Sequence, residues 1–127
     1  MILIIGGNSQ GKLQFAQEML QVGNEMISDG GTCQLDQAFA KPVLNRLHLL
    51  ISRLKQQGLD PYSFIKQGIE NNPEITIICD ELGLGVVPID REERELQELT
   101  GRLLCDLARR AAQVYRVHCS IPVKIKG

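Results

Sequence analysis

The chain has 127 residues and a mass of 14.1 kDa, and its 14 Lys and Arg against 15 Asp and Glu give a net charge of −1. A chain of this length forms one domain and buries about two-thirds of its unfolded surface, so it needs no disulfide or metal to fold. Its 43% hydrophobic content excludes the disordered class, and its near-zero charge argues against a generic nucleic-acid or membrane-surface binder. No apolar run is long enough for a signal peptide or a membrane span, so we expect a cytoplasmic protein.

The four cysteines include no CxxC pair, which excludes zinc-ribbon and thioredoxin spacings. In the reducing cytoplasm such cysteines are expected to act as small hydrophobic residues.

The first third of the chain predicts a strand, a glycine turn and a helix. The aliphatic run Ile2–Ile5 is typical of a strand buried on both faces of a parallel sheet. Apolar residues then recur at helical spacing from Lys12 to Leu20. Residues 25–28 predict a short second strand, which the turn signal at 29–31 ends.

The middle of the chain predicts two helices and a strand. Pro42 suits the first position of a helix, and an apolar stripe continues to Leu54 before Gly58 ends it. Asp60-Pro61 starts a second helix that stops at residues 71–73, and residues 75–78 predict the next buried strand.

The last third predicts a long helix and two strands. Asp90 and Glu93 resemble a capping box before a leucine stripe that runs to Ala111. Residues 114–119 predict a strand, and the alternation over 123–126 predicts a half-exposed edge strand whose lysines protect the edge. Strands alternating with helices indicate an α/β layer protein with a single domain over residues 1–127.

The turn after the first strand matches a phosphate-binding motif. It satisfies G-x-x-x-x-G-K between a buried strand and a helix, with the residues Gly6, Gly7, Asn8, Ser9, Gln10, Gly11 and Lys12. Backbone N–H groups of such a loop point at phosphate oxygens, and Lys12 would reach the terminal phosphates. The alternative is a glycine-rich turn with an exposed lysine. Leu13 stands where the motif has Ser or Thr, and its side chain cannot coordinate Mg²⁺.

Strand-end carboxylates are the candidates for holding Mg²⁺. Asp80 and Glu81 follow the strand at 75–78, and Asp29 follows the short second strand. The alternative for each is a carboxylate that caps a turn. His48, on an apolar helix, and His118, in a strand, are interpreted as structural.

The segment from Asp80 to Pro88 resembles the adenosylcobinamide kinase / adenosylcobinamide-phosphate guanylyltransferase family of cobalamin biosynthesis, which carries an Asn-Glu-Val-Gly-x-Gly-Ile-Val-Pro signature here. The resemblance continues through Arg94, Gly101 and the closing Val123-Lys124-Ile125-Lys126, and the glycine loop is similar to the family's P-loop. It implies a P-loop NTPase-like three-layer α/β sandwich with a mostly parallel sheet and a C-terminal edge hairpin.

The resemblance also implies chemistry and assembly. It implies phosphoryl transfer from ATP or GTP to the cobinamide hydroxyl, GMP transfer through a guanylylated histidine, and a homotrimer. The segment that holds the family's histidine is shortened here, and no histidine precedes His48. If Asp29 corresponds to the carboxylate ending the family's next strand, the second strand and its histidine loop were deleted together.

We therefore expect a kinase-like nucleotide-binding enzyme that has lost guanylyl transfer. Lys12 and Glu81 would be catalytic, residues 6–12 would bind ATP or GTP, and Asp29 or Asp80 would hold Mg²⁺. A corrinoid would contact the substrate loop at Glu81, Gly83, Gly85 and Pro88. The alternatives are an inactive relative that binds a nucleotide or corrinoid or joins a partner subunit, and an interaction domain with an empty P-loop.

Overall fold

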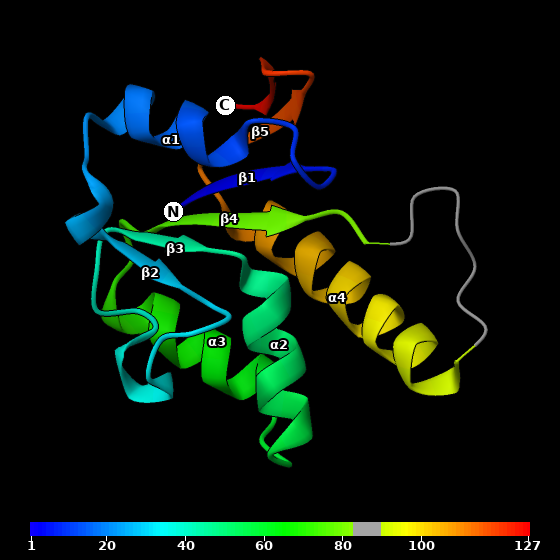
Figure 1. Cartoon of the computed structure of the whole chain (residues 1–127). Coiled ribbons are helices and arrows are strands. Elements are labelled where there is room, and N and C mark those ends of the chain that lie inside the picture. Colours follow the sequence, from blue (N-terminus) through cyan, green and yellow to red (C-terminus); the bar gives the residue numbers. More distant parts are fainter. Residues whose placement is uncertain (83–89) are drawn as a thin grey trace.

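The computed structural model describes residues 1–82 and 90–127, and these form a six-stranded sheet with four helices (Figure 1). The strands have the spatial order β2-β3-β4-β1-β5-β6, and all are parallel except β6, which pairs antiparallel with β5. The strands are β1 (Ile2–Gly6), β2 (Ile27–Asp29), β3 (Val43–Asn45), β4 (Thr76–Asp80), β5 (Gln113–His118) and β6 (Ile121–Lys126). The helices are α1 (Lys12–Leu20), α2 (Leu47–Gln56), α3 (Pro61–Asn71) and α4 (Arg91–Arg110).

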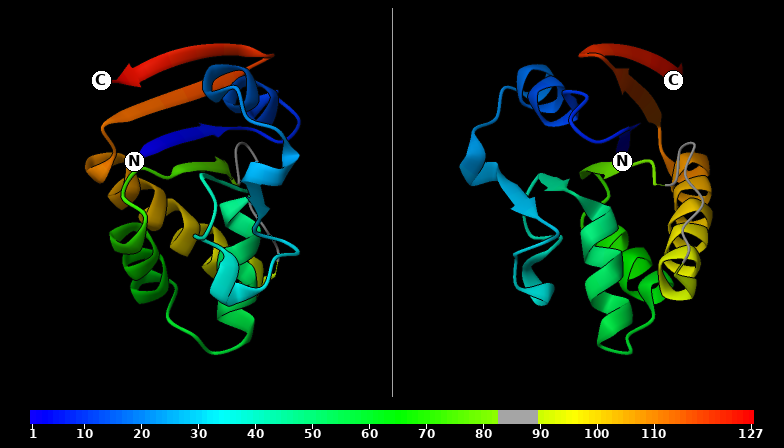
Figure 2. Two further views of the ribbon diagram at one scale, coloured as in Figure 1. Left: turned by 90° about the vertical axis from the view of Figure 1, so that its left-hand side faces the viewer. Right: turned by 45° about the vertical axis from the view of Figure 1, so that its right-hand side comes forward.

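Helices cover both faces of the sheet (Figure 2). On one face, α1 packs over a smaller cluster around Ile4 and Ala16. On the other face, α2, α3 and α4 enclose the larger core around Leu3, Leu44 and Leu107. The three-layer α/β sandwich with a mostly parallel sheet and a C-terminal hairpin is therefore confirmed, and it is consistent with a P-loop-like fold. No helix in the described part of the chain has both the length and the apolar character to cross a membrane.

Helices α3 and α4 begin after Asp60 and Asp90, where the local sequence predicts helix starts. Asp60 Oδ1 accepts a hydrogen bond from the Tyr62 backbone N–H at 3.1 Å, and Asp90 Oδ1 accepts one from the Glu92 N–H at 3.0 Å. Each side chain satisfies a donor that the first helical turn leaves unpaired, so the predicted cap at Asp60 is confirmed. Asp90 also caps its helix, but it bonds the Glu92 N–H, and the predicted pairing with Glu93 is not formed.

The prediction of a helix beginning at Pro42 is wrong. Val43 and Leu44 are fully buried in β3, between β2 and β4, and α2 begins only at Leu47. Arg46 lies between β3 and α2 in the left-handed conformation, with a φ of 58°, and so separates the strand from the helix. Two apolar residues fit a helical stripe as well as a short buried strand, so periodicity could not separate the two.

The last strand is more exposed than predicted. All six residues of β6 are exposed, including Ile121 at 64%. Lys126 is more than a charge at a sheet edge, because its Nζ donates to the carbonyl oxygens of Ala108 and Arg109 at 2.9 and 2.8 Å. This contact satisfies carbonyls at the C-terminal end of α4, where a cation is favourable.

The parallel strands bring their carboxyl ends to one edge of the sheet. Gly6 at the end of β1 is the register partner of Asp80 at the end of β4. Asp29 at the end of β2 pairs instead with Asn45 at the end of β3. In open α/β sheets this edge is where ligands bind.

Candidate nucleotide site

The glycine loop, residues 6–12, leaves β1 and enters α1 as the sequence predicts (Figure 1). Gly6 has a φ of 155°, and a Cβ there would collide with the carbonyl oxygen of Val117. Gly11 has a φ of 90°, and a Cβ there would lie 2.8 Å from Ser120 Oγ. Both positions therefore require glycine, because the loop passes directly against the end of β5.

The turn between β5 and β6 holds the glycine loop, which sequence reasoning missed. The Ser120 N–H donates to the Gln10 carbonyl at 2.9 Å, and the Cys119 N–H donates to Gln10 Oε1 at 2.7 Å. Cys119 and Ser120 have φ values of 51° and 62°, which non-glycine residues seldom adopt. The pair Cys119-Ser120 is not the Asn-Gly pair that typically marks a two-residue hairpin turn, so the local sequence did not predict this turn.

Lys12 turns inward in this structure. Only 6% of its surface is exposed, and its Nζ lies 2.7 Å from Asp80 Oδ1 and donates to the Gly7 carbonyl at 2.6 Å. The structure thus joins two predicted site residues, Lys12 and Asp80, in one ion pair behind the loop. The alternative of an exposed lysine is wrong.

His48 completes this cluster from α2. Its Nδ1 accepts a hydrogen bond from the Asp80 backbone N–H at 3.2 Å, and its Nε2 lies 3.4 Å from Asp80 Oδ2. Burial lowers the pKa of His48, and the Asp80 carboxylate opposes that shift only in part. The sequence interpretation recognised a buried helix residue but had no signal for its partner 32 positions away.

Cys79 precedes Asp80 on β4 and is fully buried. Burial raises the pKa of its thiol to about 12, because a thiolate there would have no water around it. Cys79 therefore fits the expectation of a small buried hydrophobic residue, and Cys33 is half-buried, but the expectation is wrong for Cys105 and Cys119, which are exposed.

Asp29 lies outside this cluster. It is two strands from Asp80 in the sheet order, and Arg46 makes a bidentate ion pair with it, with Nε 2.9 Å from Oδ1. The Arg46 guanidinium lowers the pKa of Asp29 below its ordinary range. The structure does not bring Asp29 to Lys12, so of the two predicted magnesium carboxylates only Asp80 lies behind the glycine loop.

Glu81 directly follows β4, and its side chain reaches Arg116 of β5, the strand on the other side of β1. Its carboxylate makes a bidentate pair with Arg116, with both N–O distances 2.9 Å, and its N–H donates to the Gly6 carbonyl at 2.8 Å. A cavity of about 230 Å³ is lined by Gly6, Gly7, Glu81, Arg116, Val117 and His118. Glu81 thus borders the glycine loop, and the sequence missed Arg116 and His118 as its neighbours. The other residues predicted for the substrate loop, Gly83, Gly85 and Pro88, lie outside the described residues.

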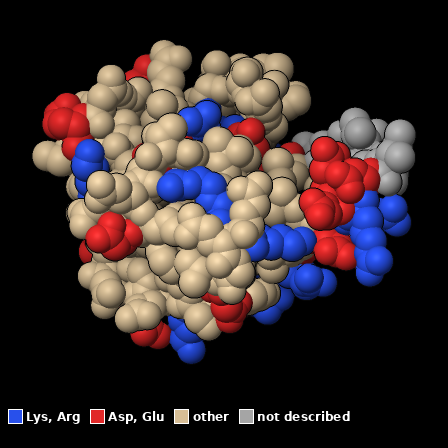
Figure 3. Space-filling model, turned by 60° about the horizontal axis from the view of Figure 1, so that its bottom comes forward, with Lys and Arg blue, Asp and Glu red and all other residues tan. Residues whose placement is uncertain are grey.

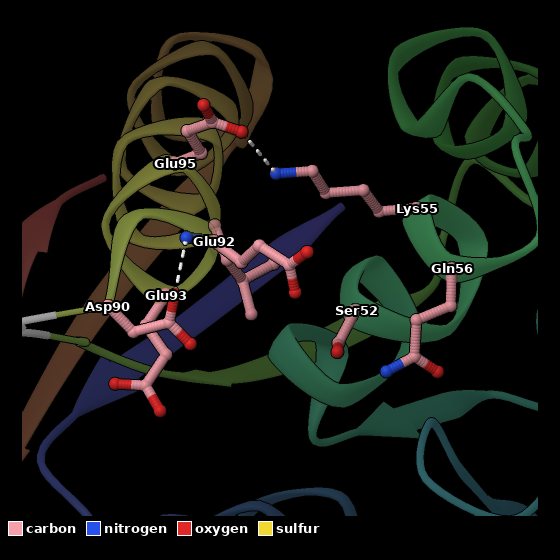
Figure 4. A pocket seen from close by; sticks show the side chains of 8 residues that line it. Ser52, Lys55, Gln56, Asp90, Glu92, Glu93 and Glu95 are labelled. Atoms are coloured by element: carbon pink, nitrogen blue, oxygen red, sulfur yellow. Dashed lines mark hydrogen bonds and ion pairs between the residues drawn. The ribbon is translucent and has the colours of Figure 1, made fainter.

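A larger pocket of about 490 Å³ opens between α2 and α4 (Figure 4). Its lining carries Lys55, which pairs with Glu95 at 3.4 Å, together with the carboxylates of Asp90, Glu92 and Glu93. Figure 3 shows acidic side chains beside basic ones at the end of the molecule where α4 begins. The pocket lining itself has four carboxylates against one lysine, which disfavours the binding of phosphates there.

Among the described residues, Asp80 is the carboxylate beside Lys12 that could hold Mg²⁺ at the glycine loop. In the described ranges, 1–82 and 90–127, no three His, Cys, Asp or Glu side chains gather where they could hold a metal ion. Mg²⁺ at phosphate-transfer sites takes one or two carboxylates, substrate phosphates and water, and Asp80 supplies one such carboxylate. Leu13 packs against the cluster beneath α1 and supplies no ligand.

A central parallel strand, a glycine loop and a helix opened by a lysine form an α/β protein whose fold is consistent with the P-loop-like class. The family model described as cobinamide kinase / cobinamide phosphate guanyltransferase matches residues 62–125, which is half of the chain. The chain belongs to this family. The match covers Glu81 and Arg116 but does not reach the glycine loop. A search of curated proteins found no match.

Proposed function

We propose that the protein is a kinase-like phosphotransferase that takes ATP or GTP and phosphorylates the side-chain hydroxyl of cobinamide in cobalamin biosynthesis. The observation that carries this proposal is the pairing of Lys12 with Asp80 behind the glycine loop, in a chain of the cobinamide kinase family. A lysine and a strand-end carboxylate at this loop are the groups that phosphoryl transfer uses.

In this proposal the phosphates displace Asp80 from Lys12. The loop N–H groups and the helix N-terminus attract the phosphate oxygens, and Lys12 offsets the charge on the terminal phosphate. Asp80, released from the lysine, would hold Mg²⁺, which would offset charge on the phosphates. The bond from the terminal phosphorus to its bridging oxygen breaks, a bond to the cobinamide hydroxyl oxygen forms, and Glu81 takes the hydroxyl proton.

Guanylyl transfer is absent in this proposal. The resemblance assigns that step to a histidine in a segment that is shortened here. His48 does not replace it, because the ring is buried and both its nitrogens face Asp80. A nitrogen engaged in this way cannot attack a phosphorus atom.

The experiment measures thermal stability with ATP and GTP, each with and without Mg²⁺. At a hundredfold excess over the dissociation constant, a ligand stabilises by about 2.7 kcal/mol, which raises Tm by several degrees. We expect this shift for the wild type and for Lys66→Ala, which removes an exposed lysine of α3, but not for Lys12→Ala. Phosphate transfer to cobinamide is then followed with labelled nucleotide. A wild type that no nucleotide stabilises contradicts the proposal.

The second candidate function is a nucleotide or corrinoid binder without catalysis. Leu13 favours it, because its side chain packs against the core where a hydroxyl would ligate Mg²⁺. Leu13→Ser separates the two. If the wild type transfers no phosphate and the variant does, the protein is an inactive relative; if the wild type transfers phosphate, it is an enzyme despite Leu13.

A further inference from the structure

The imidazole ring of His48 contacts Asp80 of β4 through both of its nitrogen atoms. The Asp80 backbone N–H lies 3.2 Å from Nδ1, and Asp80 Oδ2 lies 3.4 Å from Nε2. The side chain of His48 is 9% exposed and that of Asp80 is 18% exposed. A histidine that only fills space in the core would need neither contact.

The backbone contact determines where the ring carries its proton. Nδ1 accepts the Asp80 N–H, so its lone pair must be free of a proton. In a neutral ring the proton is then on Nε2, on the side of the Asp80 carboxylate. The contact with Oδ2 is therefore a donor facing an acceptor.

The contacts continue from Asp80 into the glycine loop. Asp80 Oδ2 faces His48, and its Oδ1 lies 2.7 Å from Lys12 Nζ, which also donates to the Gly7 carbonyl. The orientation of this carboxylate decides which oxygen faces the loop. His48 is the neighbour that can set this orientation from the core side.

We propose that His48 is a positioning residue of the nucleotide site, which fixes the end of β4 through Nδ1 and the Asp80 carboxylate through Nε2. This inference rests on the proposed nucleotide binding at the glycine loop. Partners that orient a site carboxylate or imidazole typically change affinity 10- to 100-fold when they are removed.

Two substitutions separate the two contacts. In His48→Gln the amide nitrogen reaches the place of Nε2 and can donate to the Asp80 carboxylate. In His48→Asn the amide oxygen replaces Nδ1 as acceptor for the Asp80 N–H, and nothing replaces Nε2. His48→Leu keeps an apolar volume and removes both contacts.

The measurement is the dissociation constant for ATP or GTP with Mg²⁺, next to the stability of each variant. We expect about tenfold weaker binding for His48→Asn and His48→Leu, and recovery to within about threefold of wild type for His48→Gln. Equal nucleotide affinity in all three variants, or affinities that follow only their stabilities, would overturn the proposal.

A spectroscopic measurement tests the contact without nucleotide. The ¹⁵N shifts of the His48 ring in the wild type at neutral pH should report a proton on Nε2, with the exposed His118 as the reference in the same spectrum. A proton on Nδ1 would overturn the inference. If the ring has the expected proton but no nucleotide binds, the proposed function fails while the contact stands.

Discussion

Two carboxylate pairs lie at the same edge of the sheet in different surroundings. The inner pair, Asp80 with Lys12, lies behind the glycine loop with side chains 18% and 6% exposed. The outer pair, Asp29 with Arg46, lies at the ends of β2 and β3 with side chains 33% and 44% exposed. Both carboxylates are the last residue of a strand, yet only Asp80 contacts the glycine loop, through Lys12. The position of the strand in the sheet, rather than the residue type, decides the role of its terminal carboxylate.

The largest expected difference between the pairs is in stability. Asp80→Asn leaves the Lys12 ammonium buried without its counter-charge, and breaking such a pair costs about 3 kcal/mol of unfolding free energy. The matched control Asp29→Asn removes an exposed carboxylate and should cost less than about 1 kcal/mol. Urea unfolding of the three proteins measures both values. Equal losses would show that burial does not distinguish the two pairs.

Alkaline unfolding sharpens the comparison through Cys79, which lies beneath the inner pair. Its pKa rises from 9.0 to about 12 on folding, so above pH 9 the unfolded chain loses a proton that the folded chain keeps. Stability present below pH 9 should then fall as the pH rises, with a slope that approaches about 1.4 kcal/mol per pH unit above pH 10. Cys79→Ala should remove this slope, as measured by urea unfolding at several pH values. If the variant has the same pH slope as the wild type, the Cys79 thiol is solvated in the folded protein and its pKa is not raised.

The smallest effect is expected for the outer pair at acidic pH. The Arg46 side chain holds the pKa of Asp29 below its ordinary value of 3.8, so this pair stabilises the fold above that pH. Its contribution is lost as the pH falls through the folded pKa. Arg46→Gln should therefore show a shallower loss of stability below about pH 4 than the wild type. Urea unfolding between pH 5 and 3 measures this difference. If the free energy of unfolding falls equally in both proteins, the outer pair does not stabilise the fold.

Local signals in the sequence predicted the elements that depend on neighbouring residues. The aliphatic run of β1, the cap at Asp60 and the cap at Asp90 each need only a few adjacent residues to define them. The glycine loop was also readable, because Gly6 and Gly11 meet backbone demands that the motif itself encodes.

Contacts between distant segments were not readable in the same way. Val43 and Leu44 form a strand because β2 and β4 lie on either side, and no local pattern carries that pairing. Arg116 lies 35 positions from Glu81, and Ser120 lies 110 positions from Gln10 in a chain numbered 1–127. Each pair meets because parallel strands bring their carboxyl ends to one edge.

The sequence alone determined that this is an α/β protein with a glycine loop, a lysine at its end and a leucine in place of a magnesium ligand. Only the tertiary structure decided which carboxylate faces that lysine and that His48 lies behind it. The physical reason is the strand order: β4 is hydrogen-bonded to β1, so Asp80 lies beside Gly6, whereas β2 is at the edge of the sheet and leaves Asp29 to Arg46.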